Sequence, residues 1–267
     1  MHEEEKISDN GDIVDDVQRE EWMQQQITLK SRLIETDDIS FSTDNEFTGL
    51  RYIGGVDLSF VKDNNNDAIA SLVVLTYPAL EILYTDYQKV SLDYPYIAGF
   101  LAFREVAPLL SLITSLQSKQ PSIFPQFIIV DGNGTLHPRQ FGLACHLGVL
   151  ADVPTIGVGK NFLQIDDGVE LSMPHVKKVT KDVLKKGGDV YYLKGQSGTV
   201  YGAAVRSLDT TTNPIFVSVG HRISLDTAIR LVLRCCKYRI PEPTRQADIC
   251  SREFIRTQNL EKRQSSS

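Results

Sequence analysis

Three acidic residues are predicted to lie within or beside apolar secondary structure, where a charged side chain needs a partner. Asp57 falls inside the run Gly-Gly-Val-Asp-Leu-Ser-Phe, whose composition predicts a β-strand. Asp131 ends the apolar run Phe-Ile-Ile-Val and precedes Gly-Asn-Gly, and Glu105 lies in a helical pattern between the two. An ionised carboxylate in an apolar strand is costly unless a cation or a hydrogen bond compensates it. These three positions are therefore candidates for catalysis or metal binding.

Each acid taken alone has an ordinary explanation, since a strand-terminal Asp-Gly is commonly a turn. Together they place one acid inside a first strand, one on a helix after a three-strand meander, and one at the end of a fourth strand. This is the layout of a ribonuclease H-like nuclease. Neighbouring carboxylates repel one another unless a cation lies among them, which predicts bound Mg²⁺ or Mn²⁺. Such an ion orients and activates water and stabilises the departing oxygen during in-line attack on phosphorus.

The elements that must position these acids follow from the apolar patterning. Three β-type runs at 52–60, 68–77 and 80–90 are joined by short polar or proline-containing links, which predicts an antiparallel meander. Further strands are predicted at 127–130, 155–158 and 215–219 with a hairpin over 191–206, and helices at 16–33, 98–116, 140–150, 225–236 and 244–255. The predicted fold class is α/β, a ribonuclease H-like mixed sheet with an antiparallel meander and parallel strands, flanked by helices. Ligands collect at the carboxyl ends of strands in such sheets.

Length and composition indicate one soluble domain. The chain has 267 residues, of which 42% are hydrophobic and 23% charged. We expect a single catalytic domain over 17–256, with disordered tails at 1–16 and 257–267. No apolar run approaches the roughly 20 residues that cross a bilayer, and the first residues are acidic where a signal peptide is basic. We therefore expect an intracellular protein without a membrane partner, whose four cysteines stay reduced.

Charge is distributed unevenly along the chain. Residues 1–50 carry 14 acidic and 4 basic residues, which leaves 20 acidic and 24 basic residues over 51–267. The net charge of −6 therefore comes from the N-terminal segment. The C-terminal third is rich in arginine, which favours contact with a phosphate backbone or, equally, a solvated helix face.

Five motifs stand in a specific order along the chain. They are Gly-Gly-Val-Asp57-Leu-Ser-Phe, Pro95-Tyr96-Ile97-Ala98-Gly99-Phe-Leu-Ala-Phe-Arg104-Glu105, Val130-Asp131-Gly-Asn-Gly-Thr-Leu-His137-Pro-Arg139, Gly157-Val-Gly-Lys160 and Gly220-His221-Arg222-Ile-Ser. With them, the sequence from about 50 to 256 resembles the endonuclease V family, in its eukaryotic type. The resemblance implies a monomeric, Mg²⁺-dependent endonuclease, with Mn²⁺ able to substitute. It implies cleavage of the second phosphodiester bond 3′ to inosine in single-stranded RNA, leaving 3′-hydroxyl and 5′-phosphate ends.

The resemblance also assigns roles to the acids and to two basic residues. Asp57 and Asp131 correspond to the metal ligands, and Glu105 completes the acidic cluster. Lys160 is similar to the family's catalytic lysine, whose ammonium would hold or polarise the attacked phosphate. His221 corresponds to an active-site histidine, although a lone histidine is more often structural. We expect such an enzyme in the cytoplasm and also in the nucleus or nucleolus.

Substrate recognition is implied for a second group of residues. Tyr96 resembles the wedge that fills the base stack when the inosine base leaves it, and aromatic stacking contributes about 1–3 kcal/mol per base. His137 and Arg139 resemble contacts to the substrate, including its phosphates. The pocket for hypoxanthine would consist of Gly99, Leu101, Gly132, Gly142 and Leu143.

Three other functions compete with this one. The same enzyme could act on deoxyinosine in DNA as a repair nuclease, since the few contacts to a 2′-hydroxyl that separate RNA from DNA have no sequence motif. A non-catalytic inosine-binding protein on the same fold would have lost a carboxylate, yet the acids and Lys160 are all present. A general ribonuclease for RNA–DNA hybrids would leave the wedge and pocket motifs unexplained.

Overall fold

The structure, a computed structural model, describes residues 16–61, 64–92, 94 and 97–265. The predicted N-terminal tail lies almost entirely outside these residues. At the other end, α6 (Glu242–Ser265) continues through most of the segment that we predicted as a C-terminal tail. Five of the nine residues at 257–265 are glutamine, glutamate, lysine or arginine, all of which favour a helix.

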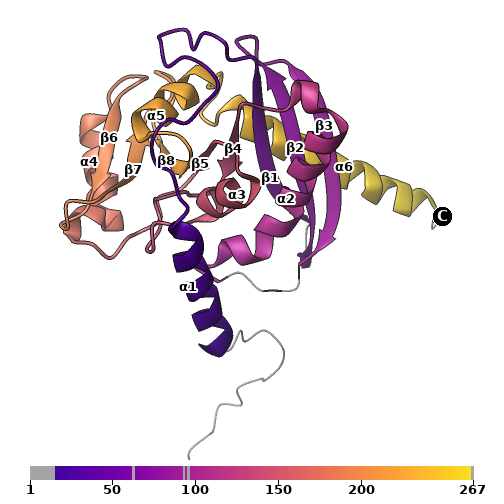
Figure 1. The fold of residues 1–267 in the computed structure, drawn as a ribbon, viewed down its shortest axis with the longest axis horizontal. Helices are drawn as coiled ribbons and strands as arrows, with labels where there is room; N and C mark the ends of the chain where they lie inside the picture. Colours follow the sequence, from indigo (N-terminus) through magenta and orange to yellow (C-terminus); the bar gives the residue numbers. More distant parts are fainter. Residues whose placement is uncertain (1–15, 62–63, 93, 95–96, 266–267) are drawn as a thin grey trace, which may run out of the picture.

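Eight strands form one mixed sheet in the order β3-β2-β1-β4-β5-β8-β7-β6 (Figure 1). The strands are β1 (Tyr52–Val61), β2 (Asn64–Thr76), β3 (Ile82–Ser91), β4 (Phe127–Asp131), β5 (Thr155–Gly159), β6 (Val190–Lys194), β7 (Val200–Val205) and β8 (Ile215–His221). The predicted antiparallel meander β1-β2-β3 is confirmed, and β1, β4 and β5 run parallel. Beyond β5 the sheet is antiparallel again, because β8 and the β6–β7 hairpin pair in that sense.

Helices cover both faces of the sheet. Besides α6 they are α1 (Asp16–Lys30), α2 (Leu101–Lys119), α3 (Leu143–Ala151), α4 (Met173–Val183) and α5 (Leu225–Arg234). Alternate residues of β4 face opposite sides: Phe127 and Ile129 belong to the core under α5 and α6, Ile128 and Val130 to the core under α2 and α3. In Figure 1, α2 and α3 lie in front of the sheet and α6 passes behind β1 and β2. This two-sided burial explains the unbroken apolar run of β4.

The predicted first helix forms and packs on the body of the protein. Trp22 of α1 stacks on Phe103 of α2, with ring centroids 4.9 Å apart. Leu29 packs with Phe141 and Cys145 on the side of α3. No helix among the described residues is both long and apolar enough to span a membrane.

Most C-terminal arginines are used within the protein. Arg222 pairs with Asp38 and Asp152, and Arg230 donates hydrogen bonds to the carbonyl oxygens of Thr43 and Asp44. These contacts join the acidic segment between α1 and β1 to β8 and α5. The structure therefore favours the structural reading of these two arginines over phosphate contact.

Candidate active site

Two of the predicted acids meet at the centre of the sheet. Val56 pairs with Val130 across the parallel strands β1 and β4, so Asp57 and Asp131 lie next to each other at the carboxyl end of β4. The Asp57 residue is only 7% exposed. Burial, and then the charge and hydrogen bonding of Asp131, raise the pKa of Asp57 to about 8. The Asp57 carboxyl group therefore keeps its proton readily unless positive charge comes close.

Lys160 supplies one positive charge at this point. It follows β5, whose Val158 pairs with Asp131, and its Nζ lies 2.5 Å from Asp131 Oδ2. Burial lowers the pKa of Lys160, but the nearby charges of Asp131 and Asp57 outweigh burial and raise it. The lysine is thus held as an ammonium ion beside the two carboxyl groups.

Glu105 approaches from α2 and is also 7% exposed. Burial raises the pKa of Glu105 to about 8, against the opposing charge of Arg104, and Asp131 contributes to the rise. The predicted acid thus lies within electrostatic reach of Asp131. It belongs to a helix on one face of the sheet, whereas Asp57 faces the other.

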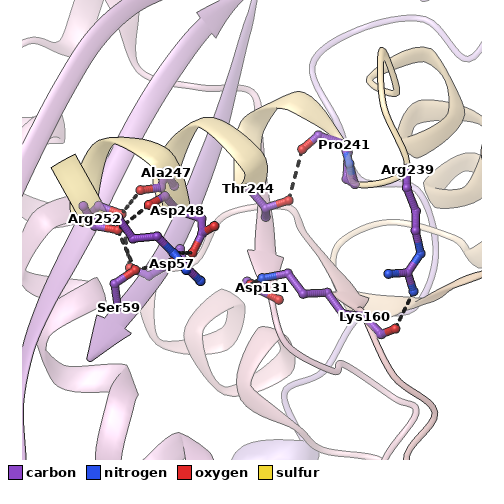
Figure 2. A network of polar contacts seen from close by, with 12 residues as sticks. Asp57, Ser59, Asp131, Lys160, Arg239, Pro241, Thr244, Ala247, Asp248 and Arg252 are labelled. Atoms are coloured by element: carbon purple, nitrogen blue, oxygen red, sulfur yellow. Dashed lines mark hydrogen bonds and ion pairs between the residues drawn. The ribbon is translucent and has the colours of Figure 1, made fainter. Parts of the chain in front are cut away.

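A fourth acid, Asp248 of α6, joins the site and escaped the sequence prediction. Its charge contributes to the raised pKa of Asp57, and its Oδ1 accepts a hydrogen bond from Arg252 Nε at 2.7 Å. Figure 2 shows Asp248 and Asp57 on neighbouring elements, with Asp131 and Lys160 nearby. In sequence Asp248 is one acid on a polar helix, and the only signal was its place between the small residues Ala247 and Ser251, both buried. We call Asp57, Glu105, Asp131 and Asp248 the acidic cluster.

The absence of a side chain at Gly55 and the small side chains of nearby serines let α6 approach β1 closely, which brings Asp248 to the site. A Cβ atom on Gly55 would lie 2.2 Å from the backbone of Pro243 in α6, so only glycine fits there. Further along, Ser59 Oγ lies 2.7 Å from Ser251 Oγ and donates to Asp57 Oδ2 at 3.2 Å. Ser71 of β2 donates to the carbonyl oxygen of Ala247 at 3.0 Å.

His221, predicted as an active-site histidine, lies away from the acidic cluster. It ends β8, which runs antiparallel to β5, so it pairs with Thr155 at the start of β5 while Lys160 follows the end of that strand. Five strand residues separate these positions by about 15 Å. His221 Nδ1 accepts a hydrogen bond from the backbone N–H of Ile34, which indicates a structural role.

A small pocket, here the Gly99 pocket, contains most of the predicted base-binding residues. Its cavity volume is about 80 Å³. Its lining residues are Gln26, Gly99, Leu101, Ala102, Asn133, His137, Gly142, Leu143 and Leu163. The predicted Gly132 is not in the lining but packs against Leu143, since a Cβ on Gly132 would lie 3.2 Å from the Leu143 side chain. The cavity is smaller than the roughly 300 Å³ at the lower end for ligand pockets, so it must widen to take a base.

Hydrogen bonds from Gln26, His137 and Arg139 converge on one wall of the Gly99 pocket. His137 Nε2 lies 3.0 Å from the carbonyl oxygen of Gly99, and Arg139 also donates to that oxygen. Gln26 of α1, only 1% exposed, donates to the carbonyl oxygens of Gly99 and Phe141 at 3.2 Å and accepts from Arg139 Nε at 2.5 Å. Sequence reasoning missed Gln26, which looks like any polar residue of an amphipathic helix.

The predictions for His137 and for the wedge Tyr96 have different outcomes. Burial, followed by the charge of Arg139, lowers the pKa of His137 to about 4, so it is neutral at physiological pH and forms pocket wall. The proposed wedge, Tyr96, lies outside the described residues.

The donor chemistry of the acidic cluster suits a hard divalent cation. Carboxylate oxygens are the ligands that Mg²⁺ prefers, and burial together with repulsion from Asp131 raises the pKa values of Asp57 and Glu105, so their ionised forms would be stabilised by an added cation. Within the part of the chain that the structure describes, however, no three acidic, histidine or cysteine side chains are arranged to hold one ion. Asp57 and Asp131, which are in contact, would be the ligands, and Glu105 does not join them in a single ligand set.

Comparison with known proteins identifies the family. The family model for endonuclease V matches residues 28–249. The chain belongs to the endonuclease V family. It is 53% identical to mouse endonuclease V over 235 residues, covering 88% of this chain and 69% of the mouse protein. Against human endonuclease V the identity is 52% over 235 residues, covering 88% and 82%. Membership in this family makes the protein a nuclease.

Solved endonuclease V structures share its fold. The catalytic domain of human endonuclease V superposes with a TM-score of 0.86 at 48% identity, covering 91% of this chain and 98% of that one. Endonuclease V from Ciona intestinalis, bound to a 23mer DNA with an inosine followed by a ribo-adenosine, gives 0.84 at 36% identity, covering 91% and 99%. The predicted ribonuclease H-like mixed sheet is confirmed.

Proposed function

We propose that this endonuclease V cleaves the second phosphodiester bond 3′ to inosine in single-stranded RNA, with Mg²⁺ as its cofactor. The observation that carries the proposal is the acidic cluster beside the Lys160 ammonium, together with the narrow Gly99 pocket. The two are close because Asn133, which lines the pocket, follows Asp131 by two residues. The cluster and lysine suit a phosphodiester, and the pocket suits a base turned out of the strand.

The chemistry divides among this chain's residues. Lys160 binds a non-bridging oxygen of the attacked phosphate. To do so, its ammonium group leaves the Asp131 carboxylate that it contacts in the structure. Asp57 and Asp131 would hold the cation, and Asp57 would lose its proton when the cation binds. When bound, the cation supplies charge stabilisation for the attacking water and the departing 3′-oxygen. Asp248, and Glu105 once it ionises, would add negative charge around that cation.

Selection of inosine rests on the polar atoms of the Gly99 pocket. Hypoxanthine carries a hydrogen on N1 and an acceptor at O6, whereas adenine carries the reverse pattern. Asn133 lines the pocket, and its buried Oδ1 has no hydrogen-bond partner among the described residues. An unsatisfied buried acceptor costs about 1–3 kcal/mol, so a base that donates from N1 is favoured over one that does not.

Support for RNA over DNA comes from a relative. The Ciona protein was captured on a strand in which a ribonucleotide follows the inosine, which places a 2′-hydroxyl next to the lesion in that complex. Deoxyinosine in DNA remains the second candidate substrate, since the same complex is otherwise DNA.

The deciding experiment incubates the purified protein and Mg²⁺ with end-labelled single-stranded RNA carrying one inosine. Matched adenosine RNA and deoxyinosine DNA run beside it. We expect inosine-dependent cutting one nucleotide beyond the lesion, fastest on RNA. Faster cutting of the DNA would assign the protein to DNA repair. Binding of inosine RNA without cleavage of any strand would overturn the nuclease assignment for this substrate.

A further inference from the structure

A second cavity, which we call the Lys160 cavity, lies beside Lys160 and has no assigned role. Its volume is about 530 Å³, within the range of roughly 300–1,000 Å³ that holds small molecules. Its wall comes from the segment after β5, from α4, from the start of β8 and from Arg239 ahead of α6. Lys160 is the residue that it shares with the catalytic site.

The chemistry of its wall suits a nucleotide. Lys160, Lys177 and Arg239 border the cavity, and no acidic residue among those described does so. The same wall includes the aromatic residues Phe162 and Phe216, whose rings lie 5.6 Å apart. Cations that attract phosphate together with apolar and aromatic surface for a base are the features by which proteins bind single-stranded nucleic acids.

Arg239 makes this wall a fixed structure. Its guanidinium donates hydrogen bonds to the carbonyl oxygens of Lys160 at 2.6 Å, Pro214 at 2.8 Å and Asn213 at 3.1 Å. It therefore ties the segment that carries Lys160 to the segment that enters β8. Figure 2 shows the contact between Arg239 and the Lys160 backbone, with the Lys160 side chain directed toward Asp131.

We propose that the Lys160 cavity binds the nucleotide on the 3′ side of the cleaved bond, the one that keeps the 5′-phosphate. This inference rests on the proposed function. With the inosine base in the Gly99 pocket, the strand passes Asp131 with one intervening nucleotide and presents the second phosphate to Lys160. The next nucleoside then enters the cavity that Lys160 borders, where Lys177 meets the following phosphate. The enzyme then binds the RNA on both sides of the cleaved phosphodiester bond.

The substrate arm of the test removes one base at a time. Single-turnover cleavage is measured on inosine RNA and on matched RNA that is abasic at the nucleotide 3′ of the cleaved bond. A third RNA is abasic two nucleotides further along. We expect the first abasic site to slow cleavage at subsaturating enzyme by about tenfold and the distant one to leave it within about twofold. Equal rates on all three RNAs would overturn the proposal.

The protein arm compares two neighbouring lysines of α4. Lys177 borders the cavity and Lys178 does not, and both are exposed, so Lys177→Glu and Lys178→Glu change the same charge at adjacent positions. We expect Lys177→Glu to slow cleavage of intact RNA and to shrink the penalty of the abasic site, with Lys178→Glu close to the wild type in both. Equal behaviour of the two variants would contradict the proposal.

The two arms separate this inference from the proposed function. If the wild type does not cut inosine RNA at all, the proposed function fails before the cavity is tested on it. If the wild type cuts inosine RNA and ignores the base 3′ of the cut, only the cavity assignment fails. Equal thermal unfolding midpoints of both α4 variants and the wild type exclude a folding defect as the cause of a slower rate.

Discussion

The carboxyl group of Asp57 shows how one residue can be costly for folding and useful for chemistry. It is buried beside Asp131 and under Asp248, so its ionised form is disfavoured until a cation arrives. The same geometry makes cation binding favourable, since the ion relieves repulsion among the acids. Lys160 provides this relief for Asp131 in the structure.

Neutralising either central acid should separate binding from catalysis. We expect Asp57→Asn and Asp131→Asn to slow cleavage of inosine RNA by at least about a hundredfold while RNA binding changes little, because the cation loses a ligand. Cleavage rates and filter binding measure the two effects. Asp226→Asn is the matched control, since Asp226 lies in the first turn of α5 and accepts a hydrogen bond from Tyr192. Full activity in either central variant would refute the metal assignment.

The raised pKa of Glu105 predicts how pH and Mg²⁺ change the thermal stability of the protein. Its folded-state pKa is about 8 against an ordinary value of 4.5, so the stability it contributes is present below about 4.5 and is lost as pH rises through 8. With EDTA, the unfolding midpoint should therefore fall between pH 5 and 8, and Glu105→Gln should flatten that fall. Mg²⁺ should raise the midpoint more at pH 8 than at pH 6. Glu81→Gln, at an exposed position, serves as control; the same pH slope in Glu105→Gln and wild type would contradict the assignment.

At the scale of elements, α1 is a support for the Gly99 pocket. Gln26 connects this helix to the carbonyl oxygens of Gly99 and Phe141 and to Arg139, three points that come from two loops around the pocket. A helix that precedes the sheet in sequence thus fixes the wall against which a base would rest.

Replacing Gln26 should loosen that wall without touching the acids. Gln26→Leu leaves two carbonyl oxygens and an arginine N–H with fewer partners, at a cost of about 1–3 kcal/mol. We expect KM for inosine RNA to rise about tenfold with kcat nearly unchanged. Gln25→Leu is the matched control, because Gln25 is an exposed neighbour on the same helix. A fall in kcat with constant KM would indicate that Gln26 acts on the acidic cluster instead.

Element patterns explain which site residues could be predicted from sequence. Asp57 and Asp131 could be proposed from sequence because an acid within or at the end of an apolar strand needs a partner, and Lys160 could be proposed from the resemblance of its motif to the family. The position of His221 could not be predicted, because β8 pairs with β5 in the opposite direction, which no local pattern shows. Asp248 depends on the docking of α6 through Gly55, a tertiary contact that helix periodicity does not encode.

At the scale of the whole molecule, buried histidines should limit acid stability. His146 is 1% exposed, packs against Phe103 and Phe141, and has a pKa that burial lowers to about 4. It contributes stability above its unfolded-state pKa near 6.5, and this stability is lost as pH falls through 4.

His146→Leu should therefore make unfolding less sensitive to acid. The difference in pKa corresponds to about 3 kcal/mol, which the wild type loses between pH 6.5 and 4 and the variant keeps. Urea unfolding at pH 4.5 and pH 7 measures it. His175→Leu changes a half-buried histidine and should keep the wild-type slope. An unchanged slope in His146→Leu would show that the imidazole is not buried as described.

The docking of α6 on β1 has a consequence for the synthesis of the protein. Asp57, Glu105, Asp131 and Lys160 leave the ribosome well before Asp248, and Gly55 receives Pro243 only when the last helix has been made. During synthesis the acidic cluster is therefore unfinished until α6 has been made and has docked on β1. The order of the elements along the chain makes completion of the active site a late step of folding.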